Sequence, residues 1–274
     1  NNAHYTSPVV INAIYSALEN IGFKGGTILE PAMGTGNFFG TMPEEMKDNS
    51  SLYGVEIDEI TGRIAKQLYQ SANITVSGFE NTNFANNYFD AAIGNVPFGD
   101  YKVYDKEYNE LNFKIHDYFF AKTLDKVRPG GVVAFITSQG TMDKKDETVR
   151  KYLAQRAELL GAIRLPNNAF KGIAGTEVTT DIIFLQKRDK AIEIDADWIS
   201  RDTLDTGIEV NKYFADHPEM ILGTMVEGNK MFGSGTMCVP IEGKTLKEQL
   251  AEAIKNIKGE YKKQEKKEIE QEKI

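Results

Sequence analysis

The chain has 274 residues, of which 41% are hydrophobic and 26% are charged, and its formal net charge at pH 7 is −8. No apolar run approaches the ~20 residues that a membrane-spanning helix needs. The acidic balance disfavours a protein that coats itself with nucleic acid, although it leaves room for a local basic cleft. The single cysteine, Cys238, excludes an internal disulfide or a cysteine zinc cluster, and the three histidines show no ligand spacing. We therefore expect no metal and a reducing, cytoplasmic compartment.

The first hundred residues alternate between helix and strand patterns. After a Ser-Pro start, residues 7–23 carry apolar side chains at helical spacing and predict a helix. Short apolar runs then predict four strands, at residues 27–31, 51–57 and 73–79 and within residues 89–101, where the run Ala91-Ala92-Ile93 stops at Gly94. Asp58 is placed to cap the helix that follows the second strand, and that helix carries Ile60, Ile64 and Leu68 on one face.

The next ninety residues continue the alternation and then break it. A helix is predicted at residues 116–127, broken by Pro129-Gly130-Gly131, then a strand at 132–138 and a helix with apolar residues at 149, 153, 157 and 160. Two last strands, at residues 159–166 and 179–187, have no helix between them, so we expect an antiparallel hairpin at one sheet edge. The predicted fold class is therefore α/β: a doubly wound, mostly parallel seven-stranded sheet with this hairpin at its edge.

The pattern weakens from about residue 191 onward. We expect residues 1–190 to form one domain and residues 191–274 to form a C-terminal extension. Within the extension, apolar side chains at helical spacing over residues 246–257 predict one amphipathic helix. The charged end of the chain is expected to be a solvated helix or a linker.

Two motifs follow the first two strands. Glu30 and Pro31 end the first strand, and Gly34 and Gly36 lie in the turn behind it, where glycine lets the backbone approach a ligand. The turn lacks the Lys-Ser/Thr pair of a phosphate-binding loop, which disfavours a nucleoside triphosphate. Glu56 ends the second strand, roughly 20 residues after the turn, where a carboxylate suits ribose hydroxyls. A surface acid near a helix start is the alternative for Glu56, and a dinucleotide enzyme shares both motifs.

The end of the fourth strand separates these alternatives. Asn95, Val96, Pro97 and Phe98 lie there, and on their own they are typical of a strand-ending turn. Together with the two earlier motifs, however, the chain resembles the N6-adenine DNA methyltransferases, whose signature at this place is an acidic residue or Asn, two prolines and an aromatic. The stretches "HYTSP", "EPAMGTGNF" and "GVEID" resemble the family's other motifs in the right order. The resemblance covers residues 1–190 and is closest to the methyltransferase domain of large methylase–helicase fusion proteins of conjugative and phage-like elements.

The resemblance implies S-adenosylmethionine as the cofactor. Tyr5 and Thr6 would take its methionine end, Glu56 its ribose, and Glu80 its adenine amino group, although Glu80 is equally read as a loop carboxylate. The full set of cofactor-binding residues that the resemblance implies is Tyr5, Thr6, Glu30, Pro31, Gly34, Gly36, Glu56, Ile57, Glu80 and Asn95.

The resemblance also implies methyl transfer to the N6 amino group of adenine in DNA, with the base flipped into the site. Asn95 Oδ1 and the main-chain carbonyl of residue 96 would accept the amino hydrogens, and Phe98 would stack on the base. Valine still supplies a carbonyl, and Pro97 keeps residue 96 extended. Valine adds an N–H and loosens φ, which can lower the rate, and loss of activity does not follow from it; whether Val96 lowers or abolishes activity stays open. A proline at position 96 should then leave the rate similar or modestly higher, unless the Val96 N–H makes a bond that the fold needs.

Two further stretches carry candidate DNA contacts. Residues 99–114 interleave tyrosines with lysines and acids, and they either grip DNA or form a mobile lid. Lys144, Lys145, Arg150 and Lys151 are a candidate phosphate contact, although a solvated helix face is the favoured reading.

Partner and rival functions stay open at this point. The extension is short and acidic for a target-recognition domain, so we expect a longer polypeptide or a partner to supply that recognition. The enzymatic rivals are protein-glutamine and RNA-guanine methyltransferases, which share an Asn-Pro-Pro-aromatic motif. The rival from another class is a catalytically silent cofactor-binding module of a larger DNA-processing protein.

Overall fold

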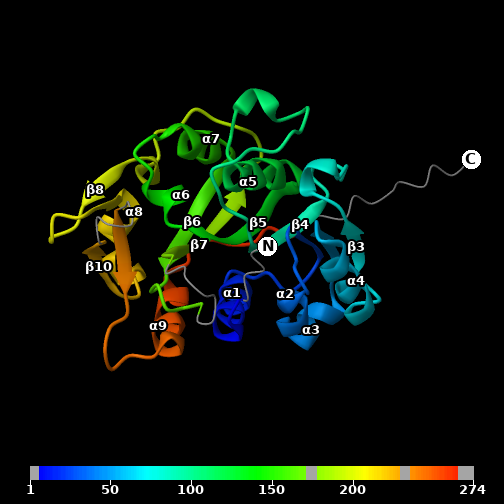
Figure 1. Cartoon of the computed structure of the whole chain (residues 1–274), viewed down its shortest axis with the longest axis horizontal. Helices are drawn as coiled ribbons and strands as arrows, with labels where there is room; N and C mark the ends of the chain where they lie inside the picture. Colours follow the sequence, from blue (N-terminus) through cyan, green and yellow to red (C-terminus); the bar gives the residue numbers. More distant parts are fainter. Residues whose placement is uncertain (1–5, 171–177, 229–234, 265–274) are drawn as a thin grey trace, which may run out of the picture.

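A seven-stranded sheet forms the centre of the computed structural model, which describes residues 6–170, 178–228 and 235–264 (Figure 1). The strands are β1 (Thr27–Glu30), β2 (Ser51–Glu56), β3 (Asn73–Val76), β4 (Phe89–Asn95), β5 (Val127–Ser138), β6 (Ala157–Arg164) and β7 (Thr180–Lys187). Their order across the sheet is β3-β2-β1-β4-β5-β7-β6. Strands β1 to β5 pair in parallel, whereas β7 pairs antiparallel with both β5 and β6. The predicted fold class is confirmed, including the hairpin at one edge.

Helices cover both faces of this sheet (Figure 1). They are α1 (Pro8–Asn20), α2 (Asn37–Thr41), α3 (Glu44–Asp48), α4 (Glu59–Leu68), α5 (Ile115–Lys126), α6 (Gly140–Asp143) and α7 (Thr148–Arg156). As predicted, Asp58 caps α4, because its side chain accepts a hydrogen bond from the Thr61 N–H. In the part of the chain that the structure describes, no helix combines the length and the hydropathy needed to cross a bilayer.

Two predicted boundaries are wrong. Strand β5 begins at Val127, and Pro129-Gly130-Gly131 lies within it, because the β4–β5 ladder continues past a register shift instead of breaking. Helix α7 ends at Arg156, so Ala157 and Leu160 belong to β6. Pairing of β6 with the buried strand β7 outweighs the helical spacing of these residues.

The apolar face of α4 points away from the sheet. Ile60, Ile64 and Leu68 are 71%, 45% and 60% exposed, whereas the helix packs through the buried residues Gly62 and Ala65. Small side chains let α4 lie close to β3, so its large apolar residues are left on the outside.

The extension forms small elements beside the sheet. They are β8 (Arg201–Thr203), β9 (Glu209–Asn211), α8 (Lys212–Asp216), β10 (Thr224–Glu227), β11 (Thr236–Val239) and α9 (Leu246–Ala253). The predicted amphipathic helix is α9, which packs against α1. Within the charged end, Tyr261 packs on the core, because its hydroxyl accepts a hydrogen bond from Arg128 at 2.6 Å. The rest of that end, from residue 265, lies outside the described residues.

A buried ion network joins the extension to the hairpin. Arg164 of β6 is fully buried and donates to both carboxylate oxygens of Asp181 at 2.8 Å and to Asp143 at 2.6 Å. The second oxygen of Asp143 accepts the Asn211 N–H at 2.9 Å, and the Phe214 ring lies 4.5 Å from the Arg164 guanidinium. One cation thereby connects β6, β7, α6 and the extension.

Replacing Arg164 with methionine should therefore destabilise the chain strongly. The change leaves the fully buried carboxylate of Asp181 without its counter-ion, which costs about 3–5 kcal/mol. Arg201→Met is the matched control, because it breaks only the exposed pair with Glu209 and should cost about 0–1 kcal/mol. Urea unfolding of the three chains measures both values, and similar small losses for the two variants would contradict the role given to Arg164.

Candidate active site

The carboxyl ends of β1, β2 and β4 meet at one edge of the sheet. Strand β1 pairs with β2 on one side and β4 on the other, so the strand order reverses direction there. In open α/β sheets, ligands bind at such a switch point. Glu30 ends β1, Glu56 ends β2 and Asn95 ends β4. The structure therefore brings together the ends of the three strands whose motifs the sequence singled out.

Glu30 is a buried acid with one carboxylate oxygen unsatisfied in the described part of the chain. Its side chain is 1% exposed, and Oε2 has no hydrogen-bond partner among the described residues. Burial, and secondly the charge of Glu56, raises the pKa of Glu30 well above its ordinary value. A buried carboxylate is costly unless a cation or hydrogen-bond donors compensate it. The site therefore suits a ligand that brings a positive group to Glu30.

The turn after β1 depends on two glycines. Gly34 and Gly36 have left-handed φ angles of +56° and +92°. A Cβ on Gly36 would lie 2.3 Å from the ring of Tyr69, so only glycine fits there. On the other side, a Cβ on Gly94 of β4 would stand 3.3 Å from Cγ of Glu30. Tyr69, which covers this turn, was missed by the sequence analysis because nothing in its helical context marks it.

The other predicted cofactor residues lie along the neighbouring strand ends. Glu56 is half-buried, and its pKa is raised by burial and then by Asp58. Ile57 follows it and is 69% exposed. Glu80 lies beyond the end of β3 in the short 3₁₀ helix η1 (Phe79–Asn81) and is half-buried. Tyr5 falls outside the described residues.

Asn95 is oriented by the N-terminal segment. Its Nδ2 donates to Oγ1 of Thr6 at 3.3 Å, and Thr6 is buried. This bond occupies the donor end of the amide, so Asn95 presents Oδ1 as its acceptor. Two predicted site residues that are 89 positions apart in the chain are thus in contact.

Val96 is held by the sheet as well. Its side chain is fully buried, and its N–H donates to the carbonyl of Ile136 in β5 at 3.1 Å. The Val96 N–H therefore makes a bond that the fold uses, and a proline at position 96 would lose this bond between β4 and β5. The exception stated for a proline at position 96 thus applies. Among the described residues, no donor bonds to the Val96 carbonyl. Valine thus extends the sheet by one residue and still offers its carbonyl.

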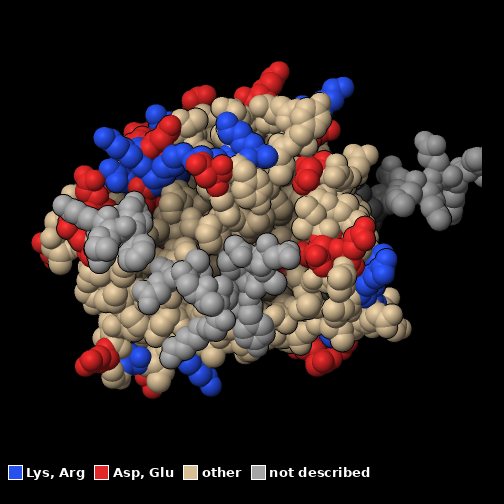
Figure 2. Space-filling model, viewed as in Figure 1, with Lys and Arg blue, Asp and Glu red and all other residues tan. Residues whose placement is uncertain are grey.

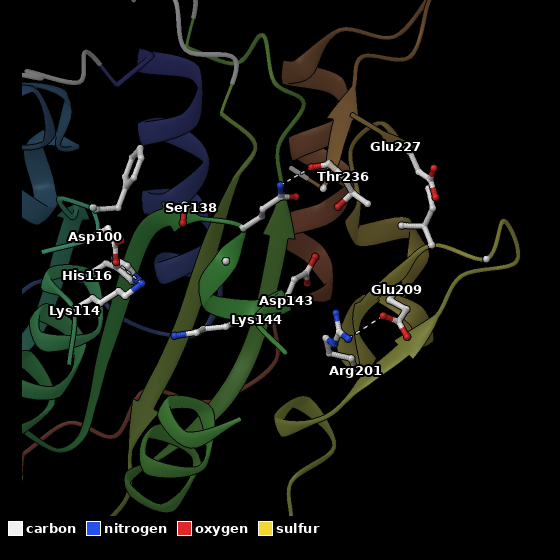
Figure 3. Close-up of a pocket in the computed structure, with 17 residues that line it drawn as sticks. Asp100, Lys114, His116, Ser138, Asp143, Lys144, Arg201, Glu209, Glu227 and Thr236 are labelled. Carbon is white, nitrogen blue, oxygen red and sulfur yellow. Dashed lines mark hydrogen bonds and ion pairs between the residues drawn. The ribbon is translucent and has the colours of Figure 1, made fainter. Parts of the chain in front are cut away.

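A groove of about 750 Å³ starts at Phe98 and runs between the sheet and the extension (Figure 3). Its lining includes Phe98, Gly99, Asp100, Lys114, His116, Ser138, Gln139, Gly140, Asp143, Lys144, Arg201, Ile208, Glu209, Glu227 and Thr236. Lys114 pairs with Asp100 at 2.6 Å, and Arg201 pairs with Glu209 at 2.8 Å. Figure 3 shows the Lys144 side chain extending from the end of α6 toward Lys114 and His116.

Positive side chains gather along one rim of this hollow (Figure 2). His116, within the groove, is mostly buried, and burial is the main cause that lowers its pKa. Nearby Lys114 and Lys144 lower that pKa further, against the opposing charge of Asp117. His116 is therefore neutral at pH 7, and the positive charge of this rim comes from lysine and arginine.

The four candidate phosphate contacts differ in burial and in whether they line the groove. Arg150 is wrong as a phosphate contact, because it is 1% exposed and its Nε donates to the Ile199 carbonyl at 2.8 Å. Lys144 lines the groove, whereas Lys145 and Lys151 are exposed and do not. The sequence analysis missed the groove residues that follow β5, such as Gln139. Their place at the carboxyl end of a parallel strand was the available signal.

A comparison with known protein families identifies the family of this chain. A family model described as N-6 DNA Methylase matches residues 2–211, which is most of the chain. The chain belongs to the N-6 DNA methylase family. The predicted resemblance is confirmed at the level of the family, and the fold and family are those of S-adenosylmethionine-dependent methyltransferases.

Individual relatives agree with this assignment. The chain is 31% identical over 190 residues to the Defense against restriction protein B of Escherichia phage P1, covering 67% of this chain but only 8% of the phage protein. A Listeria monocytogenes protein described as a class I S-adenosylmethionine-dependent methyltransferase has a TM-score of 0.58 at 22% identity, covering 71% of this chain and 64% of that one.

A further solved structure is a type I restriction-modification methyltransferase subunit from Streptococcus thermophilus. Its TM-score is 0.57 at 16% identity, covering 78% of this chain and 57% of that one. At these identities the two solved structures show the fold. The chain therefore spans less than a tenth of the phage relative and less than two thirds of either structure.

The cofactor of this family is S-adenosylmethionine, and the residues present fit it. Oε2 of Glu30, unsatisfied among the described residues, suits a positively charged group of the cofactor, and Gly34 in the following turn has open space where a Cβ would stand. Glu56 is placed to accept hydroxyl hydrogens at the next strand end. No cluster of His, Cys, Asp or Glu in the described ranges could hold a metal ion.

Glu30→Gln should stabilise the cofactor-free chain at neutral pH. Because the pKa of Glu30 is higher folded than unfolded, its stabilising contribution is full below the ordinary carboxyl pKa and is lost as pH rises through the raised value. Glutamine is neutral throughout and avoids this loss. Each kcal/mol regained should raise Tm by about 2–4 °C for a chain of this size.

Thermal melts at several pH values measure this gain. It should be largest at pH 7–8 and shrink as the pH falls toward about 4.5, and the exposed substitution Glu19→Gln should change Tm little at any pH. A Glu30→Gln chain that melts at or below the parent temperature at neutral pH would contradict the account.

Proposed function

We propose that this chain transfers the methyl group of S-adenosylmethionine to the N6 amino group of adenine in DNA, with the target base rotated out of the helix. The observation that carries this proposal is the Asn95 amide, which ends β4 beside Glu30 and is turned by Thr6 so that Oδ1 is its acceptor. An acceptor at this place answers a specific chemical need of the adenine amine.

The exocyclic amine of adenine is a weak nucleophile because its lone pair is delocalised into the ring. Two acceptors aimed at its hydrogens favour a tetrahedral nitrogen and return the lone pair to that atom. Asn95 Oδ1 is one acceptor, and the Val96 carbonyl, directed by Pro97, is the other. S-adenosylmethionine, when bound, supplies an electrophilic methyl group on a positively charged sulfur. Because β1 and β4 are neighbours, Asn95 and Glu30 hold the two reactants side by side.

The groove supports DNA as the substrate. It begins at Phe98, whose ring can stack on a base for about 1–3 kcal/mol. Lys114 and Lys144 are placed to contact phosphates next to that base. In this proposal residues 1–190 form the catalytic domain, and residues 191–274 form an extension that supplies the other wall of the groove. Because the chain matches 8% of the phage relative, further target recognition would come from a longer polypeptide or a partner.

Asn95→Ala should abolish most methyl transfer while sparing cofactor binding. The alanine removes an acceptor that acts mainly in the transition state, so the single-turnover rate should fall by about 100-fold or more. Cofactor affinity, measured by calorimetry, should stay within about twofold. Asn95→Asp is the control, because it keeps an acceptor and should retain far more activity. A parent chain without transfer, or equal rates in parent and alanine variant, would refute the proposed role.

Lys144→Ala should weaken DNA binding and flatten its dependence on salt. One lost phosphate contact lowers the slope of log affinity against log salt by about 0.9 for duplex DNA. Lys145→Ala is the matched control, because Lys145 is an exposed neighbour that does not line the groove. Fluorescence anisotropy at several salt concentrations gives both slopes. Equal slopes for the two variants would show that DNA does not follow this groove.

A further inference from the structure

Two separate segments, residues 79–82 and residues 99–114, meet at one buried lysine. Lys122 of α5 is 3% exposed, and its Nζ donates to the carbonyls of Phe79 and Thr82 at 2.9 and 3.2 Å. The same ammonium donates to Oδ2 of Asp105 at 2.8 Å. An ammonium has three N–H donors, so these three acceptors satisfy it completely.

The groups around Lys122 compensate the charge of its ammonium. Burying an ammonium is costly unless it is paired and hydrogen-bonded, and here it has a carboxylate, two carbonyls and the Phe79 ring at 5.0 Å. Burial would raise the pKa of Asp105, but the bonds from Lys122 and Tyr118 outweigh burial and lower it. Asp105 is therefore charged at neutral pH.

The Phe79 and Thr82 end of the joint lies on the cofactor side. These two residues bracket Glu80, and the turn containing them follows β3, next to the end of β2 that carries Glu56. The two carbonyls bonded to Lys122 hold this turn against α5. Any ligand that orders the turn thereby acts on the position of Lys122.

The Asp105 end of the joint lies on the target side. Asp105 belongs to residues 99–114, which continue directly from Phe98. Its Oδ1 accepts the Glu107 N–H at 3.2 Å, its carbonyl accepts the Tyr108 N–H at 2.9 Å, and Oδ2 also accepts the Tyr118 hydroxyl at 2.5 Å. Asp105 is thus one point where this segment is folded and fixed to α5.

We propose that Lys122 and Asp105 are positioning residues that couple cofactor binding to the order of residues 99–114, and so to engagement of the target. The role of this segment at the target rests on the proposed function, whereas the coupling itself does not. Cofactor that orders the turn at 79–82 stabilises Lys122 in place, and Lys122 in turn holds Asp105. By linkage, DNA that orders residues 99–114 must tighten cofactor binding by the same factor.

Hydrogen exchange with S-adenosylhomocysteine as the probe tests the coupling without DNA or activity. In the parent chain the probe should slow exchange at residues 79–82 and also at 99–114, the latter by about fivefold or more. In Asp105→Asn the turn should respond as before while residues 99–114 do not. Lys122→Met is a second variant that removes the ammonium at similar side-chain length and should behave alike.

Tyr108→Phe is the matched control. It removes the 2.5 Å bond from Tyr108 to Asp125, which also fixes residues 99–114 to α5, but it leaves Lys122 and Asp105 untouched. This variant should therefore loosen the segment in the free chain and still show the response to the probe. Loss of the response in Tyr108→Phe, or its survival in Asp105→Asn, would overturn the proposal.

The coupling also predicts a ratio of affinities. S-adenosylhomocysteine should raise the DNA affinity of the parent chain by about fivefold or more, and that of Asp105→Asn by less than about twofold. Melting temperatures of the variants, taken alongside, separate general destabilisation from lost coupling. A chain whose segment responds to the probe but whose DNA is never methylated would refute the proposed function and leave the coupling standing. A segment that ignores the probe while residues 79–82 respond would refute the coupling alone.

Discussion

The buried carboxyl of Glu30 is the constraint around which this site is organised. It stands at the end of the interior strand β1, nearly inaccessible to solvent, with one oxygen that no described residue satisfies. Glycine at position 94 lets β4 approach it, and the Glu56 charge on the other side makes its ionisation harder still. Such an arrangement lowers stability in the absence of a positively charged ligand. Proteins keep groups of this kind where binding or catalysis requires them.

The rest of the structure holds that site rigid from distant parts of the chain. Thr6 turns the Asn95 amide, and the Val96 N–H extends the β4–β5 ladder by one residue, to Val96. Arg164 ties the hairpin to the extension, which forms the far wall of the groove. Lys122 joins residues 79–82 to residues 99–114. In each of these contacts, a charged or polar group of one element bonds to a group of another element. These bonds keep the strand ends in register.

Sequence patterns predicted the sheet because alternating apolar runs and helical spacings report burial, and burial drives this fold. These patterns gave the wrong structure where a contact with a distant part of the chain determines it. Ala157 and Leu160 fit a helical face yet belong to β6, since pairing with β7 is stronger than local spacing. The spacing of Ile60, Ile64 and Leu68 predicted an apolar helix face, but it could not show that this face points away from the sheet.

The site was predicted in part for the same reason. Glu30, Glu56 and Asn95 each end a strand. Because the carboxyl ends of parallel strands lie at the same edge of a sheet, the sequence could predict that these three residues lie close together. The buried state of Arg150 and the bridge through Lys122 could not. Arg150 bonds to a carbonyl 49 positions away, and Lys122 joins carbonyls 43 and 40 positions away to Asp105, which is 17 positions away. No local pattern reports such partners.

Transfer of an isotope-labelled methyl group tests the central claim most directly. The chain would be incubated with S-adenosylmethionine carrying a trideuterated methyl and, in separate reactions, with unmethylated duplex DNA, RNA and a protein extract. Mass spectrometry of the digested products then locates the label. The account predicts trideuteromethyl on N6 of adenine in DNA. Label on RNA guanine, on protein glutamine or on none of the three, from a chain shown to bind the cofactor, would contradict it.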